Sequence, residues 1–193
     1  MVGVPEAQAA GRLSCDFFHV DTVTLRLLYV LFFINLQRRM VYFAGVTAHP
    51  VGPWVTQQAR NLVANPEDQG RLFRFLVRAR DAKFVGPFDE VVGSVGAKVV
   101  ETPFRAPKAN AFAERFVLTA RSECLDWVLI RSEHHAERVL REFVVHYNQE
   151  RPHRAVNLEQ PVPKLETQQF ETGMGVERTD RLGGLLHEYR LAA

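Results

Sequence analysis

The stretch that decides the fold is residues 110–156, which read NAFAERFVLTARSECLDWVLI, then RSEHHAERVLREFVV, then HYNQERPHRAV. In the first run, apolar residues recur at the spacing of one helix face, and Asn110 is a suitable N-cap. The middle run predicts a second helix over residues 132–148, with a buried stripe that ends at Tyr147. The stretch therefore predicts two consecutive amphipathic helices that pack on a core.

The residues before this stretch predict strands and helices in a defined order. The strand predictions rest on runs rich in apolar, aromatic and β-branched residues, and the helix predictions rest on apolar residues at helical spacing. The expected strands are 12–20, 27–36, 40–47, 74–77 and 98–102, and the expected helices are 52–64 and 87–95. The order β-β-β-α-β-α-β-α is typical of an α/β protein with a mixed sheet that helices cover.

Composition sets the broad class of the protein. A chain of 193 residues can bury one full core, and 47% hydrophobic with 24% charged residues is ordinary for a globular domain. The net charge of +2 permits a nucleic-acid partner without indicating one. Two cysteines are too few for a disulfide framework, and the longest apolar stretch, 27–36, is about half the ~20 residues of a membrane helix. The N-terminus also lacks a signal-peptide pattern, so a cytoplasmic protein without membrane contact is expected.

The helix that carries Glu114 and the motif of residues 147–154 together resemble the end of the catalytic core of DDE transposases and integrases. These are the insertion-sequence relatives of retroviral integrase, and the resemblance covers roughly residues 12–160. It implies a ribonuclease-H-like five-stranded mixed sheet with helices on both faces. It also implies DNA integration by metal-dependent phosphodiester cleavage and strand transfer, Mg²⁺ (or Mn²⁺) as cofactor, DNA as partner and self-association. The expected divisions are a flexible leader over 1–11, the catalytic core over 12–154, and a helical and loop-rich extension over 155–193.

Asp16 and Glu114 occupy the places of the first and third acids of this family. Aspartate is disfavoured in strands, and a carboxylate there is costly to bury unless something binds it. Without the family, Asp16 would be read as an edge-strand acid or the partner of an arginine, and Glu114 as a residue that favours the helix dipole. The family chemistry uses two divalent ions ~4 Å apart, which prefer oxygen ligands. The resemblance therefore implies that Asp16 and Glu114 are catalytic metal ligands.

The second acid is absent where the resemblance requires it. The family carries an aspartate followed by a basic residue after the fourth strand, and the matching position here is Ala79, followed by Arg80. Asp81 shares a strand face with Ala79 and is a candidate substitute, although it lies ~6–7 Å further along the chain. The favoured interpretation of Asp81 is nevertheless a strand-end or turn residue. The sequence thus predicts weakly bound ions and an impaired enzyme, and the alternative is an inactive nucleic-acid-binding or transposase-pairing remnant.

Basic residues near the expected site are candidate DNA contacts. They are Arg105, Lys108, Arg115 and Arg121. Acidic residues close by make ordinary surface ion pairs an equal alternative, and the motif of residues 147–153 has a packing role as its alternative to DNA contact. Only 15 residues precede Asp16, where family members usually carry a helix-turn-helix region. The resemblance therefore implies a core without its targeting module.

Overall fold

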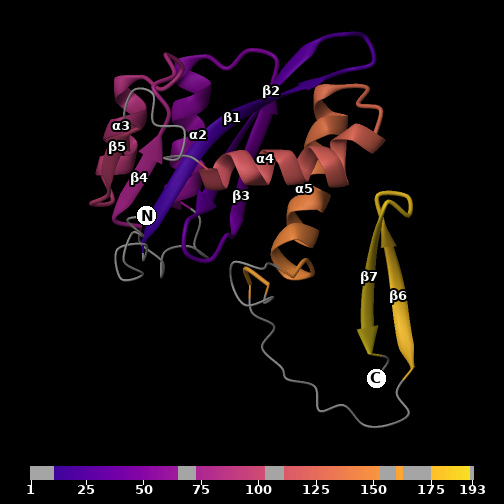
Figure 1. Ribbon diagram of the computed structural model, residues 1–193. Helices are drawn as coiled ribbons and strands as arrows, with labels where there is room; N and C mark the ends of the chain where they lie inside the picture. The colour runs from indigo at the N-terminus through magenta and orange to yellow at the C-terminus, as the bar shows by residue number, and fades with distance from the viewer. Residues whose placement is uncertain (1–10, 65–72, 103–110, 153–159, 163–174, 192–193) are drawn as a thin grey trace.

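The computed structural model describes residues 11–64, 73–102, 111–152, 160–162 and 175–191. A mixed five-stranded sheet with the order β3-β2-β1-β4-β5 forms its centre (Figure 1). β1, β2 and β3 pair antiparallel, whereas β4 pairs parallel with β1 and β5 pairs parallel with β4. The strands are β1 Arg12–Asp21, β2 Leu27–Asn35, β3 Val41–Thr47, β4 Phe75–Arg78 and β5 Lys98–Glu101.

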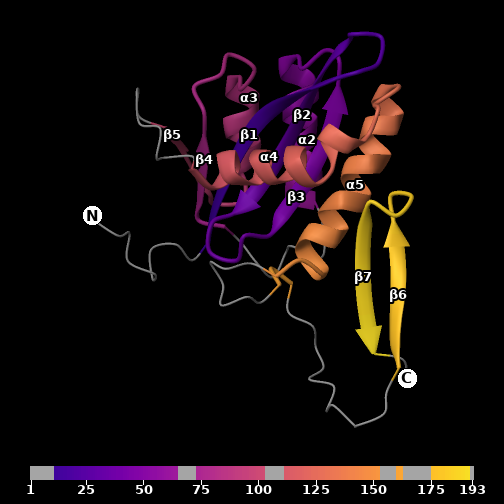
Figure 2. The same ribbon diagram turned by 45° about the vertical axis from the view of Figure 1, so that its right-hand side comes forward.

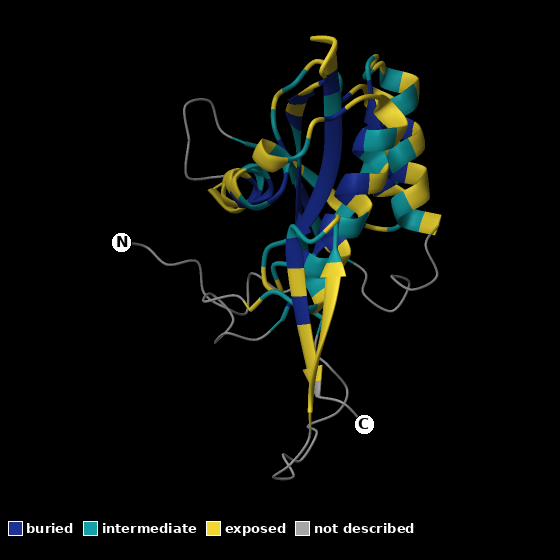
Figure 3. Cartoon of the chain, turned by 90° about the vertical axis from the view of Figure 1, so that its right-hand side faces the viewer, coloured by how far each residue is buried: buried dark blue, intermediate teal, exposed yellow. Residues whose placement is uncertain are grey.

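Helices pack on both faces of this sheet, and the buried residues concentrate in the strands between them (Figure 3). One core cluster joins the sheet to α2 and α3, and the other joins it to α4 and α5. The helices are α2 Gly52–Ala64, α3 Gly86–Gly93, α4 Ala111–Glu123 and α5 Glu133–Gln149, with a 3₁₀ turn η3 Leu125–Trp127 between the last two. This is the ribonuclease-H-like arrangement that the sequence predicted, with element ends within about two residues of the expected ones.

The alternation of side chains along β1 assigns its residues to the two clusters. Leu13 and Cys15 belong to the cluster under α2 and α3, and Phe18 and Val20 belong to the cluster under α4 and α5. Because successive strand residues point to opposite faces, Asp16 lies on the face of Phe18 and Val20. The strand therefore presents Asp16 to α4 and α5.

An antiparallel hairpin follows the core, formed by β6 Val176–Arg181 and β7 Leu186–Leu191. It lies beside α5 in two views of the ribbon (Figures 1 and 2). Gly183 and Gly184 have φ angles of 69° and 91° in its turn, a conformation that glycine adopts without strain. The sequence predicted a helical and loop-rich extension here, and the described residues 175–191 form this hairpin instead. Among the helices of the described residues, none is long and apolar enough to cross a membrane.

Candidate catalytic site

Asp16 lies in the middle of β1, beside the place where Phe32 of β2 packs against Phe116 of α4. Its cross-strand partner is Phe32 of β2, and directly opposed residues point to one face with Cβ atoms ~5 Å apart. The ring of Phe32 packs against that of Phe116 on α4, with 4.8 Å between their centroids. Asp16 is partly exposed, and its Oδ1 accepts a hydrogen bond of 2.8 Å from the backbone N–H of Phe17.

Glu114 lies in the first turn of α4 and is exposed. Two helical turns later on the same side, Arg121 Nη2 donates a hydrogen bond of 2.7 Å to the carbonyl oxygen of His19 on β1. Along the axis of α4, Glu114 lies ~10 Å before Arg121. Along β1, Asp16 lies the same ~10 Å before His19. Since α4 and β1 run in the same general direction (Figures 1 and 2), the structure brings Glu114 and Asp16 to the same side of the sheet.

Ala79 follows β4 at the edge of this site. β4 runs parallel to β1 with Arg78 opposite Cys15, and β4 ends at Arg78. The same register, carried one residue further, sets Ala79 beside Asp16. Cys15 belongs to the cluster under α2 and α3, so alternation turns Ala79 to the opposite face, which is the face of Asp16. Continued past the end of β4, this register and alternation would set the position that the resemblance assigns to the second acid beside Asp16, and that position carries a methyl group.

Asp81 lies on the other side of the sheet from Asp16, held by Lys83. Lys83 Nζ is 2.7 Å from Asp81 Oδ2, and the Lys83 backbone N–H donates to Asp81 Oδ1 over 2.9 Å. Lys83 Nζ lies 5.4 Å from the ring centre of Phe17, which packs in the cluster under α2 and α3. Burial raises the pKa of Asp81, but the hydrogen bonds from Lys83 outweigh burial and hold that pKa below its ordinary value. The structure does not bring Asp81 to Asp16.

On the face opposite Asp16, the end of β4 carries an ion network centred on the buried Arg78, which the sequence analysis missed. Arg78, whose side chain is 8% exposed, binds both carboxylate oxygens of Asp89 with Nε and Nη2, at 3.0 and 2.9 Å. Arg78 Nη2 also lies 2.8 Å from Glu101 Oε1. The hydrogen bonds to Asp89 are the main cause that raises the pKa of Arg78. This network fastens α3 and β5 to β4 next to Ala79.

The motif that ends the core fastens α5 to its neighbours. Asn148 Nδ2 donates to the Val41 carbonyl over 2.8 Å, and Asn148 Oδ1 accepts from the Val41 N–H over 2.9 Å. Arg151 binds both carboxylate oxygens of Glu123 at the end of α4, at 2.8 and 2.6 Å. Tyr147 is buried against α4, and this burial raises its pKa to about 12. These contacts give the described part of the motif a packing role.

Of the four candidate DNA contacts, only two lie within the described residues. Arg121 is engaged with β1 through His19, as above. Arg115 is exposed on α4. Arg105 and Lys108 lie outside the described residues.

The residues of this site offer fewer ligand atoms than the metal site that the resemblance implies. Asp16 and Glu114 lie on one side of the sheet, and Ala79 supplies no ligand atom. Across the described residues, no group of three or more His, Cys, Asp or Glu side chains gathers closely enough to hold a metal ion. The donor set does not match a three-carboxylate site for two ions.

Comparison with known proteins finds similarity to integrase cores. Residues 96–161 match the family model of the integrase core domain. The structure is similar to a chain of the simian T-cell lymphotropic virus intasome, solved in complex with PP2A regulatory subunit B56 gamma, with a TM-score of 0.61 and 10% identity over 95% of this chain and 67% of that one. It is also similar to the catalytic core domain of BIV integrase, with a TM-score of 0.53 and 12% identity over 79% of this chain and 91% of that one. No curated protein matches at a significant level of similarity.

The fold and the family match both support an integrase catalytic core. Its sheet and helices have the arrangement of retroviral integrase catalytic cores, and its α4–α5 region matches the integrase core domain. The recognition of an integrase or transposase catalytic core from residues 110–154 is therefore confirmed. The family match supports a function of the DNA-integration type.

Proposed function

We propose that this protein is an integrase core of the DDE transposase type that binds DNA as an oligomer, and that its cleavage and strand-transfer chemistry is impaired at the second acidic position. One observation carries the proposal. β4 pairs parallel with β1 up to Arg78 opposite Cys15, and continuing that register by one residue would set Ala79 beside Asp16, on the side of the sheet where Glu114 lies. A methyl group cannot ligate a cation, so Asp16 and Glu114 would hold Mg²⁺ or Mn²⁺ only weakly.

The arrangement around Asp81 supports this impairment. To replace the missing acid, Asp81 would have to leave two hydrogen bonds to Lys83 and cross to the other face of the sheet. Hydrogen bonds to charged groups are each worth about 1.5–3 kcal/mol, and ligand distances in a metal site tolerate errors of only about 0.2 Å. The Asp81 carboxylate is therefore a poor substitute in this conformation.

The test is to restore the acid. The Ala79→Asp variant should bind Mn²⁺ at least about tenfold more tightly by isothermal titration calorimetry, a gain of about 1.4 kcal/mol. It should also gain Mg²⁺-dependent nicking of supercoiled plasmid, a substrate that requires no knowledge of the DNA ends. The matched control is Ala79→Asn, which has the same size without the charge and should behave like the parent. Nicking by the parent that is lost in Asp81→Asn would overturn the impairment.

A second candidate function rests on the same alanine: a protein that holds DNA, or pairs with an intact transposase, and carries out no chemistry. It predicts DNA binding in gel-shift assays without divalent ions, and no nicking by the parent or by the Ala79→Asp variant. Gain of nicking by that variant would favour the impaired enzyme instead. For either function a reducing cytoplasm is the expected location, because Cys15 and Cys124 are both free and buried.

A further inference from the structure

β6 is the outer strand of the hairpin, and its free edge faces away from the core. β7 lies between β6 and α5 in both ribbon views (Figures 1 and 2). Five of the six residues of Val176–Arg181 are exposed (Figure 3). Within the described part of the chain, β6 pairs with β7 alone. A two-stranded hairpin is marginally stable, and an open edge offers unpaired backbone N–H and C=O groups to a further strand.

The charges along β6 are self-complementary. From Glu177 to Arg181 the sequence ERTDR carries the charges minus, plus, none, minus, plus. If this run pairs antiparallel with a second copy of itself about Thr179, each charged residue faces a residue of opposite charge. In an antiparallel pair of two β6 strands centred on Thr179, Arg178 of one copy therefore lies opposite Asp180 of the other. Opposite charges at directly facing positions stabilise a strand pair.

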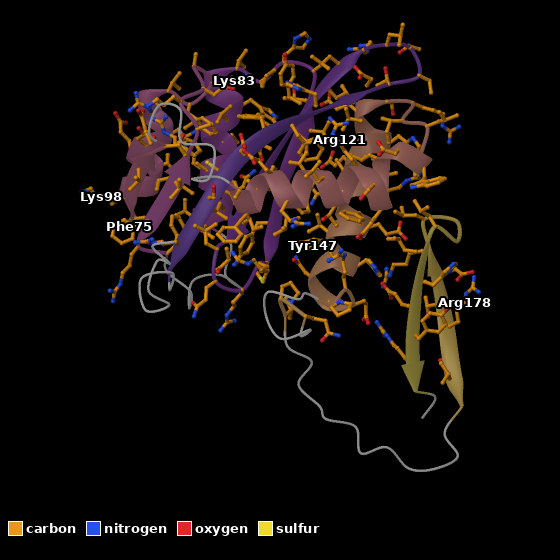
Figure 4. The ribbon with its side chains drawn as sticks, viewed as in Figure 1. Phe75, Lys83, Lys98, Arg121, Tyr147 and Arg178 are labelled. Atoms are coloured by element: carbon orange, nitrogen blue, oxygen red, sulfur yellow. The ribbon has the colours of Figure 1, made fainter. Side chains whose placement is uncertain are left out.

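The side chains that this pairing needs are already in place. Arg178 binds Asp180 of the same strand through two hydrogen bonds, at 2.7 and 3.1 Å, and both side chains are about half exposed. Arg178 lies on β6, the strand farther from α5 (Figure 4). On the same face, Val176 and Tyr189 are 67% and 59% exposed. The edge thus presents ordered charges together with unusually exposed apolar surface.

We propose that β6 is a docking edge for a second copy of this chain, in which the two β6 strands pair antiparallel about Thr179 and join the hairpins into one four-stranded sheet. The contact is isologous, as two-fold dimers are, and main-chain hydrogen bonds supply most of its affinity. The Arg178–Asp180 pairs, one on each side of the axis, fix the register. The proposal specifies a surface for the self-association in the proposed function, but its test measures molecular mass and not DNA chemistry. The two can therefore fail separately.

The test uses charge reversal on the full chain, with mass measured by sedimentation velocity over a range of concentrations. Arg178→Asp and Asp180→Arg each set like charges opposite one another in a homodimer, and each should weaken dimerisation about tenfold. An equimolar mixture of the two single variants restores opposite charges at both positions and should form a dimer as strong as the parent's. The double variant carrying both changes should also recover the parent's dimerisation.

The design separates pairing between copies from stability of the hairpin itself. Both single variants lose the Arg178–Asp180 pair within the strand, so an effect on the hairpin alone would not be rescued by mixing. His187 Nδ1 lies 2.8 Å from Asp180 Oδ1, so all variants are measured at one pH. Arg60→Asp, an exposed reversal on α2, is the control and should leave the mass unchanged. A monomeric parent, single variants that dimerise like the parent, or a mixture that fails to recover would each overturn the proposal.

Discussion

α5 is attached to the core on one side and to the β6–β7 hairpin on the other, and the two attachments differ in kind. On the core side, Leu140, Phe143 and Tyr147 are almost fully buried against the sheet and α4. Aromatic rings form much of this contact, with Phe116 and Tyr147 packed edge to face at 5.1 Å between centroids. Burial of apolar surface is the main stabilising force in such a contact, and neither pH nor salt changes it strongly.

On the hairpin side, charged groups carry much of the attachment. Glu188 of β7, whose side chain has no exposed surface, accepts hydrogen bonds from Arg181 and from His146 of α5. Glu142 of α5 accepts from the backbone N–H of Leu182 over 3.1 Å. Leu186 adds one buried apolar side chain. Because apolar burial holds one side of α5 and charged groups hold the other, the core and the hairpin can respond to different conditions. The hairpin can therefore detach while the core remains folded.

The largest effect is expected from Phe116→Ala, which removes the ring shared by β2, α4 and α5. Phe116 is 1% exposed and packs against Phe32, Phe143 and Tyr147. Truncation of a buried phenylalanine costs about 3–5 kcal/mol, so the free energy of unfolding in urea should fall by that amount. Leu118→Ala on the same helix is the control, since Leu118 is 63% exposed, and it should change stability by less than about 0.5 kcal/mol. Equal effects of the two changes would contradict the core packing described here.

The next effect is expected from Asn148→Ala, which leaves both backbone groups of Val41 without their partner. Val41 is the first residue of β3, and loss of its two hydrogen bonds to Asn148 should lower the free energy of unfolding in urea by about 2–3 kcal/mol. Asn148→Asp keeps the acceptor and loses the donor, so it should cost less. Faster exchange of the Val41 amide in the alanine variant alone would locate the effect at this contact. Unchanged exchange would show that α5 is held to β3 by other means.

The elements of the core could be predicted because each leaves a local pattern. The apolar run of residues 27–36 is typical of a central strand, and β2 is indeed buried along most of its length. The match of Ala79 to the second acid also came from the sequence, because the family carries that acid after the fourth strand. The parallel register, continued past the end of β4, would then make Ala79 a neighbour of Asp16.

The remaining features depend on partners far away in the sequence. Arg78 lies in an ordinary strand, and only the fold brings Asp89 and Glu101 to it. The strand VERTDR of β6 lacks the apolar alternation of a half-buried strand, so its pattern resembled a loop. The pair Gly183-Gly184 between two such runs was a hairpin signal that the sequence analysis did not use. The buried state of Glu188 could not be predicted, since a glutamate is buried only when its partners are in place.

A smaller effect is expected from acid, and it should reach the hairpin first. Burial raises the pKa of Glu188, but the hydrogen bonds from Arg181 and His146 outweigh burial and hold that pKa below its ordinary value. A depressed pKa stabilises the folded form above the ordinary value of about 4.3, and this stabilisation is lost as pH falls through the lower folded value. Below about pH 4, the hairpin amide resonances in NMR spectra should therefore move to unfolded positions while those of the core strands stay in place.

Glu188→Gln is the matched variant for this titration. It keeps the size of the side chain and removes the charge, so it should loosen the hairpin by about 1–2 kcal/mol at neutral pH and abolish most of its acid dependence. Other groups near this contact also titrate or carry charge, namely Glu142, His146, Glu150, Arg181 and Arg190. A variant that keeps the parent's acid transition would assign that transition to one of these groups instead.

The smallest effect is expected from Arg151→Lys at the junction of α5 with α4. The guanidinium of Arg151 binds both oxygens of Glu123, and the two side chains are 29% and 36% exposed. Lysine keeps the charge but cannot make the two parallel hydrogen bonds, so a loss of about 0.5–1 kcal/mol is expected in urea denaturation. Arg141→Lys is the control on the same helix, because Arg141 pairs with Glu137 in an exposed i,i+4 geometry worth about 0.3–0.5 kcal/mol. If Arg151→Lys costs no more than Arg141→Lys, this ion pair adds nothing to the core side of α5, and the contrast with the charged hairpin side becomes sharper.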